Sequence, residues 1–453
     1  MTKQSPQTIV ENISAEQTRL KELTQSILDE AKRQGASAAE VGTSQGNGIS
    51  INIRMGEIDT LEYHRDKSVG ITVYFGQRKG SASTSDTTIE AIKSTVAAAC
   101  NIARFTAEDP FAGLADASLM AYDYPELDLY HPWNITAEEG IKLATQCEQL
   151  AMAEDKRITN SDGASLSTYQ GVSAYGNSHG FIGVCASSRH SLSCVLIGQE
   201  AGSMQRDYEF TTARDPLDLD PIAKVAHGAA QSTVRRLGAR RVKTQKVPVI
   251  FAAEIASSLI GGFLAAISGG NLYRQSSFLL DHLGKQVFPS HIHIYEQPHI
   301  KKALGSSPFD NEGGMTKASD IITNGILQRY VLGSYSARKL GLQTTGNAGG
   351  VHNLFISTSD NDLSALLQQM DTGLLVTELM GEGANIMNGD YSRGAAGFWV
   401  EKGIIQYPVE EITIAGNLKD MLANLVLVGN DVDKRGKILT GSILLEQMMV
   451  AGE

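Results

Sequence analysis

The segment HIHIYEQPH (291–299) concentrates side chains that bind metals. His291 and His293 are two residues apart, so on a strand both imidazoles point to one face, with Glu296 and His299 nearby. Such a pair chelates zinc or copper when a third ligand converges on it. Because no HExxH motif occurs and no cysteine follows residue 194, we favour a half-exposed strand face that carries polar residues.

The segment SSPFDNEGG (306–314) places two carboxylates close together. Asp310 and Glu312 share one face if the segment is extended, and a glycine pair follows them. Paired carboxylates serve acid–base chemistry or bind a hard cation. A polar turn before the next strand explains the same residues, so both interpretations stay open.

Two segments, TTGNAGGVHN (344–353) and GANIMNGDYSRGAAG (383–397), are rich in glycine and asparagine. Neither contains GxGxxG before a helix, which argues against a phosphate site. Loops of this composition allow a peptide backbone to approach closely, including along a strand edge. Gly346 and Asn347, with Asp310 and Glu312, are therefore candidate contacts for a substrate or partner. The chain has no GxSxG motif and no Walker loop, and we predict no catalytic nucleophile.

The elements that position these residues are predicted from periodicity. Helices are expected at about 15–34, 88–105, 136–154 and 218–237, and strands at 49–63, 68–76, 79–86 and within 171–202. The order helix, short strands, helix recurs, which suggests an internal duplication of the first half. Short strands joined by tight turns predict antiparallel pairing. The expected class is α+β.

The chain is expected to form two domains, an N-terminal α+β domain at 1–240 and a β-rich domain at 241–453. The second opens on VPVIFAAEIASSLIGGFLAAISGGN (247–271), which we interpret as a buried strand and a helix at 253–268 rather than a membrane span. Short strands are expected at 291–297, 325–336, 397–409 and 410–416. Both domains should be mainly antiparallel sheet with flanking helices.

Composition narrows the function classes. The net charge of −11 gives no support for direct binding to nucleic acid. The four cysteines form no CxxC pair, and residues 1–20 lack the apolar core of a signal peptide. We expect a cytoplasmic protein of 453 residues with reduced thiols and no membrane segment.

Several stretches together resemble the TldD/PmbA family of peptidase-related proteins. They are VPVIFAAEIASSLIGG, SPFDNEGG, SYSARKLGLQTTGNAGGVHN, VTELMGEG, GDYSRGAAGFWVEKGIIQYPVEEITIAGNLKDM and VGNDV, which cover most of 247–431. The resemblance is to the PmbA (TldE) branch, which lacks the HExxxH zinc motif of the catalytic TldD branch. TldD members carry that motif on the helix after this strand, and a cysteine near the C-terminus.

Aligned without a gap, the family motif falls on GGFLAA, residues 261–266. Gly261, Gly262 and Ala266 stand there, and none of them binds zinc. The resemblance thus implies no catalytic or metal-binding residue and no cofactor in this chain, with zinc expected in a TldD-like partner. Glu254 lies outside the motif, and we expect it in the first turn of the helix, where a carboxylate complements the helix dipole.

The resemblance implies a subunit of a cytoplasmic metallopeptidase that processes unfolded peptides, such as peptide-antibiotic precursors and antitoxins. Its partner would be a TldD-like subunit in a heterodimer, or a second copy in a homodimer when alone. One alternative is a metallopeptidase in its own right, with a site built from His291, His293 and Glu296. Another is a binding protein that modulates DNA gyrase.

Overall fold

The structure, a computed structural model, describes residues 13–452. The first twelve of the residues 1–20, for which we predict no signal peptide, therefore lie outside the described residues. Its first half is one antiparallel sheet with the strand order β3-β2-β1-β4-β5-β6. The strands are β1 (Ala38–Arg54), β2 (Glu57–Phe75), β3 (Arg78–Thr84), β4 (Ile158–Asn177), β5 (Ile182–Glu200) and β6 (Ser203–Ala213). The helices are α2 (Ile13–Arg33), α3 (Ile89–Phe105), α4 (Ala137–Ala153) and α5 (Ile222–Arg235), with single 3-10 turns at Ala117–Leu119 and Pro216–Asp218.

This half is built from two repeats of helix, three strands and helix. The first repeat runs from α2 to α3 and the second from α4 to α5, in agreement with the predicted recurrence. β1 and β4 join the repeats by antiparallel pairing from Glu40↔Asn177 to Ile53↔Ala164. The antiparallel α+β class expected from the sequence is confirmed.

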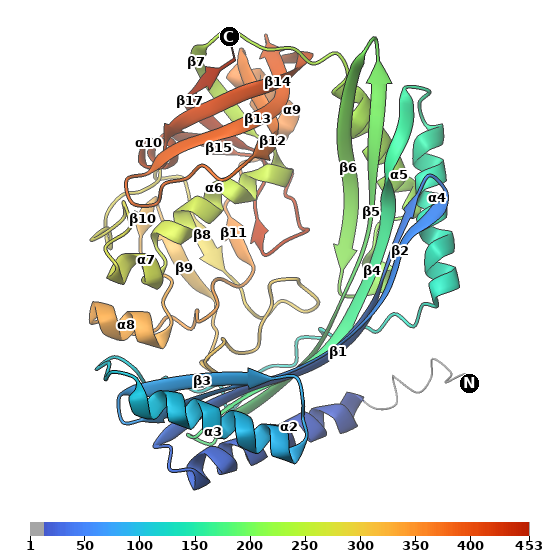
Figure 1. The fold of residues 1–453 in the computed structure, drawn as a ribbon. Helices are drawn as coiled ribbons and strands as arrows, with labels where there is room; N and C mark the ends of the chain where they lie inside the picture. The colour runs from blue at the N-terminus through green and yellow to red at the C-terminus, as the bar shows by residue number, and fades with distance from the viewer. Residues whose placement is uncertain (1–12, 453) are drawn as a thin grey trace.

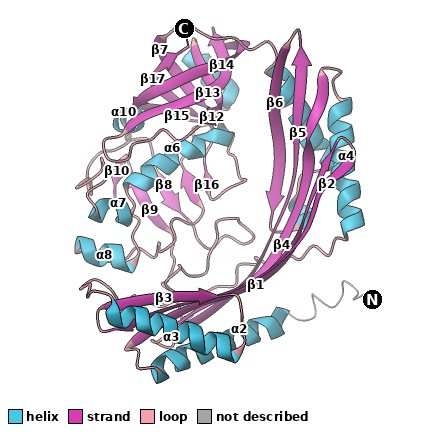
Figure 2. Cartoon of the chain, viewed as in Figure 1, coloured by secondary structure: helices cyan, strands magenta, loops and turns pink. Residues whose placement is uncertain are grey.

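Alternation along the strands separates the two faces of the sheet. On β1, Val41 and Ile51 are buried on one face, Val41 in a core with α2 and α3 and Ile51 in a core with α4 and α5. Figures 1 and 2 show all four helices on the outer side of the curved sheet. The inner side faces the C-terminal half of the chain (Figure 1).

The C-terminal half contains two further sheets. One has the order β14-β13-β12-β7-β17-β15, and β14 also pairs with β17, so five of its strands close into a ring. The other has the order β10-β9-β8-β11-β16. Both sheets and α6 share a single hydrophobic core. This core includes Phe251, Phe263 and Ile294. The elements are β7 (Gln245–Phe251), α6 (Ala253–Ala266), α7 (Gly269–Tyr273), β8 (Ile294–Glu296), β9 (Ser319–Thr323), β10 (Ile326–Leu327), α8 (Ser334–Leu340), β11 (Leu354–Ile356), α9 (Leu363–Met370), β12 (Gly373–Met380), β13 (Asp390–Glu401), β14 (Ile404–Asn417), α10 (Leu418–Ala423), β15 (Leu425–Val428), β16 (Ile438–Leu439) and β17 (Ile443–Ala451).

Two strands predicted as continuous are hairpins. The predicted strand 49–63 turns at Met55-Gly56, and 397–409 turns at Lys402-Gly403. In both turns the non-glycine residue also has positive φ, 52° in each case, as a tight two-residue hairpin requires. Methionine and lysine are not usual turn residues, so the sequence pattern concealed both turns.

Two other predicted segments also differ from the structure. In the predicted strand 325–336, β10 ends at Leu327, although the backbone N–H of Gln328 still bonds to Ile321 of β9; the N–H of Val331 bonds instead to Ile267, and α8 begins at Ser334. Residues 390–397, predicted as loop, belong to β13. Small residues are needed there, since a Cβ on Gly397 would meet the carbonyl oxygen of Leu375 at 1.9 Å.

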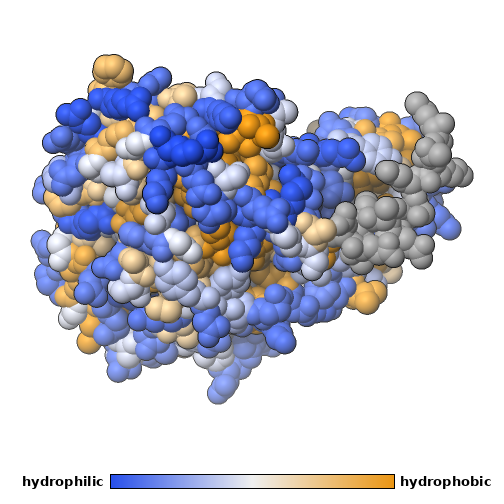
Figure 3. All heavy atoms as spheres, turned by 90° about the horizontal axis from the view of Figure 1, so that it is seen from below, coloured by the Kyte–Doolittle hydropathy of each residue, from blue (hydrophilic) through white to orange (hydrophobic). Residues whose placement is uncertain are grey.

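The apolar stretch at 247–271 is part of the core of the C-terminal half. Its helix α6 has 14 residues, and no helix within residues 13–452 is both long and apolar enough to span a bilayer. Seen from below, the molecule is mostly hydrophilic, with hydrophobic residues gathered toward the middle of that face (Figure 3).

Candidate functional site

Asp310 ties together the two loops that hold the predicted contact residues. Its Oδ1 accepts the backbone N–H groups of Glu312 (2.9 Å) and Gly314 (2.8 Å), and its Oδ2 accepts that of Ala348 (3.0 Å). The side chain is 2% exposed. The structure therefore brings the 306–314 and 344–353 segments into one unit, which sequence spacing did not predict.

Asn347 belongs to a buried polar network behind these loops. Its amide Nδ2 donates to both oxygens of Glu296 (3.0 and 3.1 Å), and its Oδ1 accepts from Arg329 (2.7 Å). Arg329 also donates to Glu296 at 2.6 Å, and the backbone N–H of His352 donates to the same carboxylate at 3.0 Å. The buried carboxylate is thus paired with one guanidinium and hydrogen-bonded on both oxygens.

Glu312 and Gly346 also make contacts within the chain. Glu312 accepts the N–H of Ser334 (2.9 Å), the first residue of α8. Gly346 has a φ of +72°, and a Cβ there would lie 2.4 Å from the carbonyl oxygen of Met315. Glycine is needed at this position because two loop backbones approach closely.

Burial raises the pKa of Asp310 to about 6, although its three backbone N–H partners oppose that shift. The folded protein therefore holds a proton that the unfolded chain releases above about pH 4, so stability falls as pH rises from about 4 to about 6. We expect Asp310→Asn to remove this dependence, which is about 3 kcal/mol for two pKa units.

The measurement is urea unfolding of both proteins between pH 4 and pH 7. The difference in free energy of unfolding between the two proteins should change from about pH 4 to about pH 6 and level off between pH 6 and pH 7. The exposed Asp123 supplies a matched Asp→Asn control, for which the difference should stay flat. A flat difference for Asp310→Asn as well would show that the buried carboxyl titrates as it does in water.

A cavity of about 470 Å³ lies between the inner face of the sheet and the loop that carries Asp310. The sheet contributes mainly small residues, and the loop contributes 306–311. The sheet residues are Gly42, Thr43, Ser44, Ser68, Gly70, Ser173, Ala174, Tyr175, Cys185 and Ser187. The Tyr175 hydroxyl is anchored on Glu40 at 2.9 Å. The glycine, serine and threonine residues offer hydroxyl and backbone groups with little side-chain bulk, and larger side chains also line the cavity, namely Leu129, Tyr175, Arg214 and Phe309.

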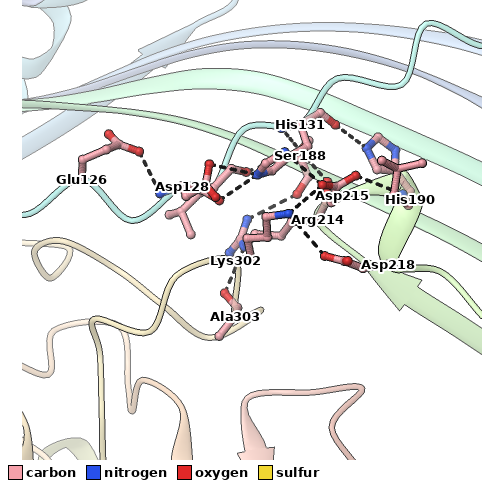
Figure 4. Close-up of polar contacts among 12 residues, drawn as sticks. Glu126, Asp128, His131, Ser188, His190, Arg214, Asp215, Asp218, Lys302 and Ala303 are labelled. Carbon is pink, nitrogen blue, oxygen red and sulfur yellow. Dashed lines mark hydrogen bonds and ion pairs between the residues drawn. The ribbon is translucent and has the colours of Figure 1, made fainter.

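A cluster of charged residues lies where the sheet meets the C-terminal half (Figure 4). The His131 imidazole lies 3.1 Å from Asp128 and 3.3 Å from Asp215. Lys302 contacts Asp215 at 2.7 Å and Asp218 at 3.6 Å. The Lys302 hydrogen bond, and then the N–H of Leu217, hold the pKa of Asp215 below its usual value.

The same junction includes Ser188 and Arg214 (Figure 4). The Ser188 hydroxyl donates to the Arg214 carbonyl (2.8 Å) and accepts the backbone N–H of His131 (2.8 Å), so it does not form a serine–histidine nucleophile. The Arg214 guanidinium donates to the carbonyls of Ala303 and Leu304, both at 3.0 Å. This cluster fastens the end of β6 to the 297–306 loop.

A groove of about 590 Å³ adjoins this junction. One wall is the end of β6, and the opposite wall holds Tyr295 and Phe355, whose rings stack at 5.3 Å. Sequence reasoning missed the residues of the junction because they come from four separate segments with no common spacing. The Pro- and Asp-rich composition of 108–133 was the one local signal, and it does not identify His131.

Residues 261–266 are part of a core helix. Phe263 and Ala266 are fully buried, and a Cβ on Gly262 would lie 3.4 Å from Leu418. Glycine, phenylalanine, leucine and alanine side chains have no zinc-binding atom, so this segment does not fit a zinc ion. Within residues 13–452, no group of three or more His, Cys, Asp or Glu side chains is placed to hold a metal.

Glu254 lies in the first turn of α6, as predicted. Its side chain reaches solvent, yet the protein around it desolvates the carboxylate enough to raise its pKa, an effect that Arg235 and Arg435 oppose.

The structure does not bring His291, His293 and Glu296 together. His293 lies 2.9 Å from Asp320 on the half-exposed side of the strand, and His291 is exposed. Glu296 is an odd number of residues away and points to the buried side, toward Arg329. His299 contacts Thr316 at 2.9 Å.

Comparison with known proteins places this fold. Residues 39–103, 130–237 and 244–452 match PmbA/TldA metallopeptidase domain 1, the central domain and the C-terminal domain, respectively. The chain is 49% identical to Metalloprotease PmbA of Escherichia coli O157:H7, over 98% of this chain and 99% of that protein. It is also 49% identical to a Metalloprotease PmbA homolog of Haemophilus influenzae, over 97% and 98%.

Solved structures show the same architecture. A crystal structure of a proposed modulator of DNA gyrase from Bacteroides thetaiotaomicron matches with a TM-score of 0.90 and 28% identity, over 96% of this chain and 99% of that one. TldE from Thermococcus kodakarensis has the same fold, with a TM-score of 0.81 over 95% and 100% of the chains at 21% identity. The molecule is thus an α+β protein of the metallopeptidase-related class. This chain belongs to the PmbA/TldD metallopeptidase family.

Proposed function

We propose that this chain is the PmbA/TldE-type subunit of a cytoplasmic metallopeptidase. It shapes a chamber that holds extended peptides, and a TldD-like partner supplies the zinc ion and the catalytic residues. The family membership supports a role in peptide hydrolysis, and the apolar residues at 261–266 argue for a division of labour between two subunits.

The observation that carries this proposal is the cavity next to Asp310. Its sheet wall presents mainly glycine, serine and threonine, together with Ala174, Tyr175 and Cys185. A wall of this kind lets a peptide backbone approach closely and bond to hydroxyl and backbone groups without selecting particular side chains. Such a site suits unfolded peptides of varied sequence, including antibiotic precursors and antitoxins.

The zinc chemistry, when a partner brings it, is activation of a water molecule for attack on a peptide carbonyl. This chain's own residues contribute binding and orientation. A substrate held along the sheet wall is presented to the partner's site in a fixed direction, and loss of such positioning costs about 10²-fold in rate.

The test is co-expression with the TldD homologue of the same organism, followed by cleavage of an unfolded peptide. We expect the two chains to co-purify, and the rate to fall roughly 10²-fold when this chain is omitted. Zinc should be found with the complex and not with this chain alone. Full cleavage by the TldD homologue without this chain would overturn the proposal.

A further inference from the structure

Three apolar side chains form a partly exposed row across the five-stranded sheet of the C-terminal half. Tyr295 on β8 pairs with Phe355 on β11, and Phe355 pairs with Leu439 on β16, so all three point to one face. Ile294 and Leu354, which point to the other face, are fully buried. The row forms the apolar wall of the groove of about 590 Å³, opposite the end of β6. An open apolar surface inside a groove is typical of a binding site.

The charged residues that line this groove are mainly cations. They are Arg214, Lys302, Lys434 and Asp218. Asp218 is paired with Lys302 at 3.6 Å. Arg214 and Lys434 are therefore left without an opposite charge among the lining residues. The groove suits a ligand that has an apolar body and an anionic end.

Neutral carbonyl groups hold the Arg214 side chain (Figure 4). Its guanidinium donates to the carbonyls of Ala303 and Leu304, both at 3.0 Å, and to that of Ser188 at 3.3 Å. These bonds use three of its five N–H groups. Burial lowers the pKa of Arg214, and the two other groups that act on its pKa are a thiol and a second guanidinium, not a carboxylate. A half-buried cation without an opposite charge is costly, so the anion of a ligand would stabilise it.

The groove and the cavity beside Asp310 share Arg214 as a lining residue. One loop also borders both spaces, since Ala303 and Leu304 line the groove and residues 306–311 line the cavity. The proposed function places a peptide backbone in the cavity. A peptide that follows the sheet to Arg214 meets a cation there and the apolar wall next to it. Only the last residue of a peptide joins a carboxylate and an apolar side chain at one carbon atom.

We propose that Arg214 and Lys434 bind the C-terminal carboxylate of the substrate peptide, and that the apolar side chain of its last residue lies against the apolar wall. This inference rests on the proposed function, which places the rest of the peptide in the cavity. Because only one end of a peptide carries this carboxylate, the contact fixes the direction of the chain along the sheet. The cavity accepts varied sequences, whereas the groove selects the last residue.

Fluorescence anisotropy with the full-length chain tests the carboxylate contact. The probe is an unfolded peptide with a dye at its N-terminus and leucine as its last residue, prepared as the free acid and as the C-terminal amide. We expect the free acid to bind roughly tenfold or more tightly, because the amide cannot accept charge-assisted hydrogen bonds from a cation. A free acid that ends in aspartate should bind more weakly than the one that ends in leucine, since its side chain does not suit an apolar wall.

Variants of the two cations test which residues read the carboxylate. Arg214→Gln should bind the free acid and the amide equally. Lys434→Glu, at an exposed position, should weaken binding of the free acid roughly fivefold and leave the amide unchanged. Lys93→Glu makes the same charge change on the exposed side of α3 and should alter neither. Because Arg214 also fastens β6 to the neighbouring loop, thermal melting checks its fold, and Lys434→Glu tests the contact without that loop.

Equal affinity of the unmodified chain for the free acid and the amide, or no binding of either, would overturn the inference. So would a preference for the free acid that survives in a folded Arg214→Gln variant. Displacement of the labelled peptide by a nucleoside monophosphate but not by N-acetylleucine would give the groove a different occupant and overturn it as well. None of these measurements uses cleavage, so the co-expression assay with the TldD homologue tests the proposed function separately.

Discussion

Arg329→Met is expected to lower the free energy of unfolding by about 3–5 kcal/mol. The guanidinium forms an ion pair with the Glu296 carboxylate, whose side chain is 2% exposed, and it also donates to Asn347. Burial lowers the pKa of Arg329, and Glu296 opposes that shift. Methionine fills a similar volume but leaves a charged carboxylate buried without its partner.

Equilibrium unfolding in urea measures this loss, and Arg241→Met is the matched control. Arg241 pairs with Glu411 where both side chains are more than half exposed, 51% and 64%. Pairs of this kind contribute about 0–1 kcal/mol. Adding Glu296→Gln to Arg329→Met removes the buried charge and should recover part of the loss. Equal losses for Arg329→Met and Arg241→Met would contradict the assignment.

Gly70→Leu is expected to lower kcat/KM for peptide cleavage by the two-subunit enzyme roughly tenfold or more, or about 1.4 kcal/mol. Gly70 lines the cavity beside Gly42, and nothing lies within 4 Å of where its Cβ would be. The Cβ of a leucine therefore meets no neighbour, and the rest of the side chain extends into the cavity that Gly70 lines. Its side chain occupies the space that the proposal assigns to the peptide backbone.

Steady-state kinetics of peptide cleavage by the two-subunit complex measure this expected loss of kcat/KM in Gly70→Leu. Gln406→Leu, at an exposed position of β14, adds the same side chain away from the cavity and should leave kcat/KM unchanged. Thermal melting should show that Gly70→Leu remains folded, because leucine suits a strand better than glycine does. Unchanged cleavage in a folded Gly70→Leu complex would remove the cavity from the substrate path.

Local patterns predicted the longer helices α2 to α6, but not the shorter helices α7 to α10 of the C-terminal half. The expected helix at 136–154 is α4, and Thr136 forms the capping box with Glu139 that typically starts a helix. The hairpin at Met55-Gly56 was missed because tertiary pairing, rather than turn propensity, sets its geometry. The closure of β14 on β17 joins segments far apart in sequence, which periodicity does not report.

The candidate site was predictable in part. Composition indicated Asp310 and Asn347 as residues worth watching, and the structure joins their loops. The sequence did not reveal that the Glu296 side chain points away from His293 and toward Arg329, because that orientation depends on which face of the strand the core covers. His131 and Lys302 carried no local signal, since Asp215 brings them together across the fold.

The β1–β4 pairing that joins the two repeats has a consequence for biosynthesis. On the ribosome, β1 is finished at Arg54, but the residues of β4 that pair with it begin at Ala164. At usual translation rates this leaves the second edge of β1 without its strand for roughly 5–20 s. Nascent chains that end before β4 should aggregate or be held by chaperones, and chains that extend past Ala213, where the six-stranded sheet is complete, should not.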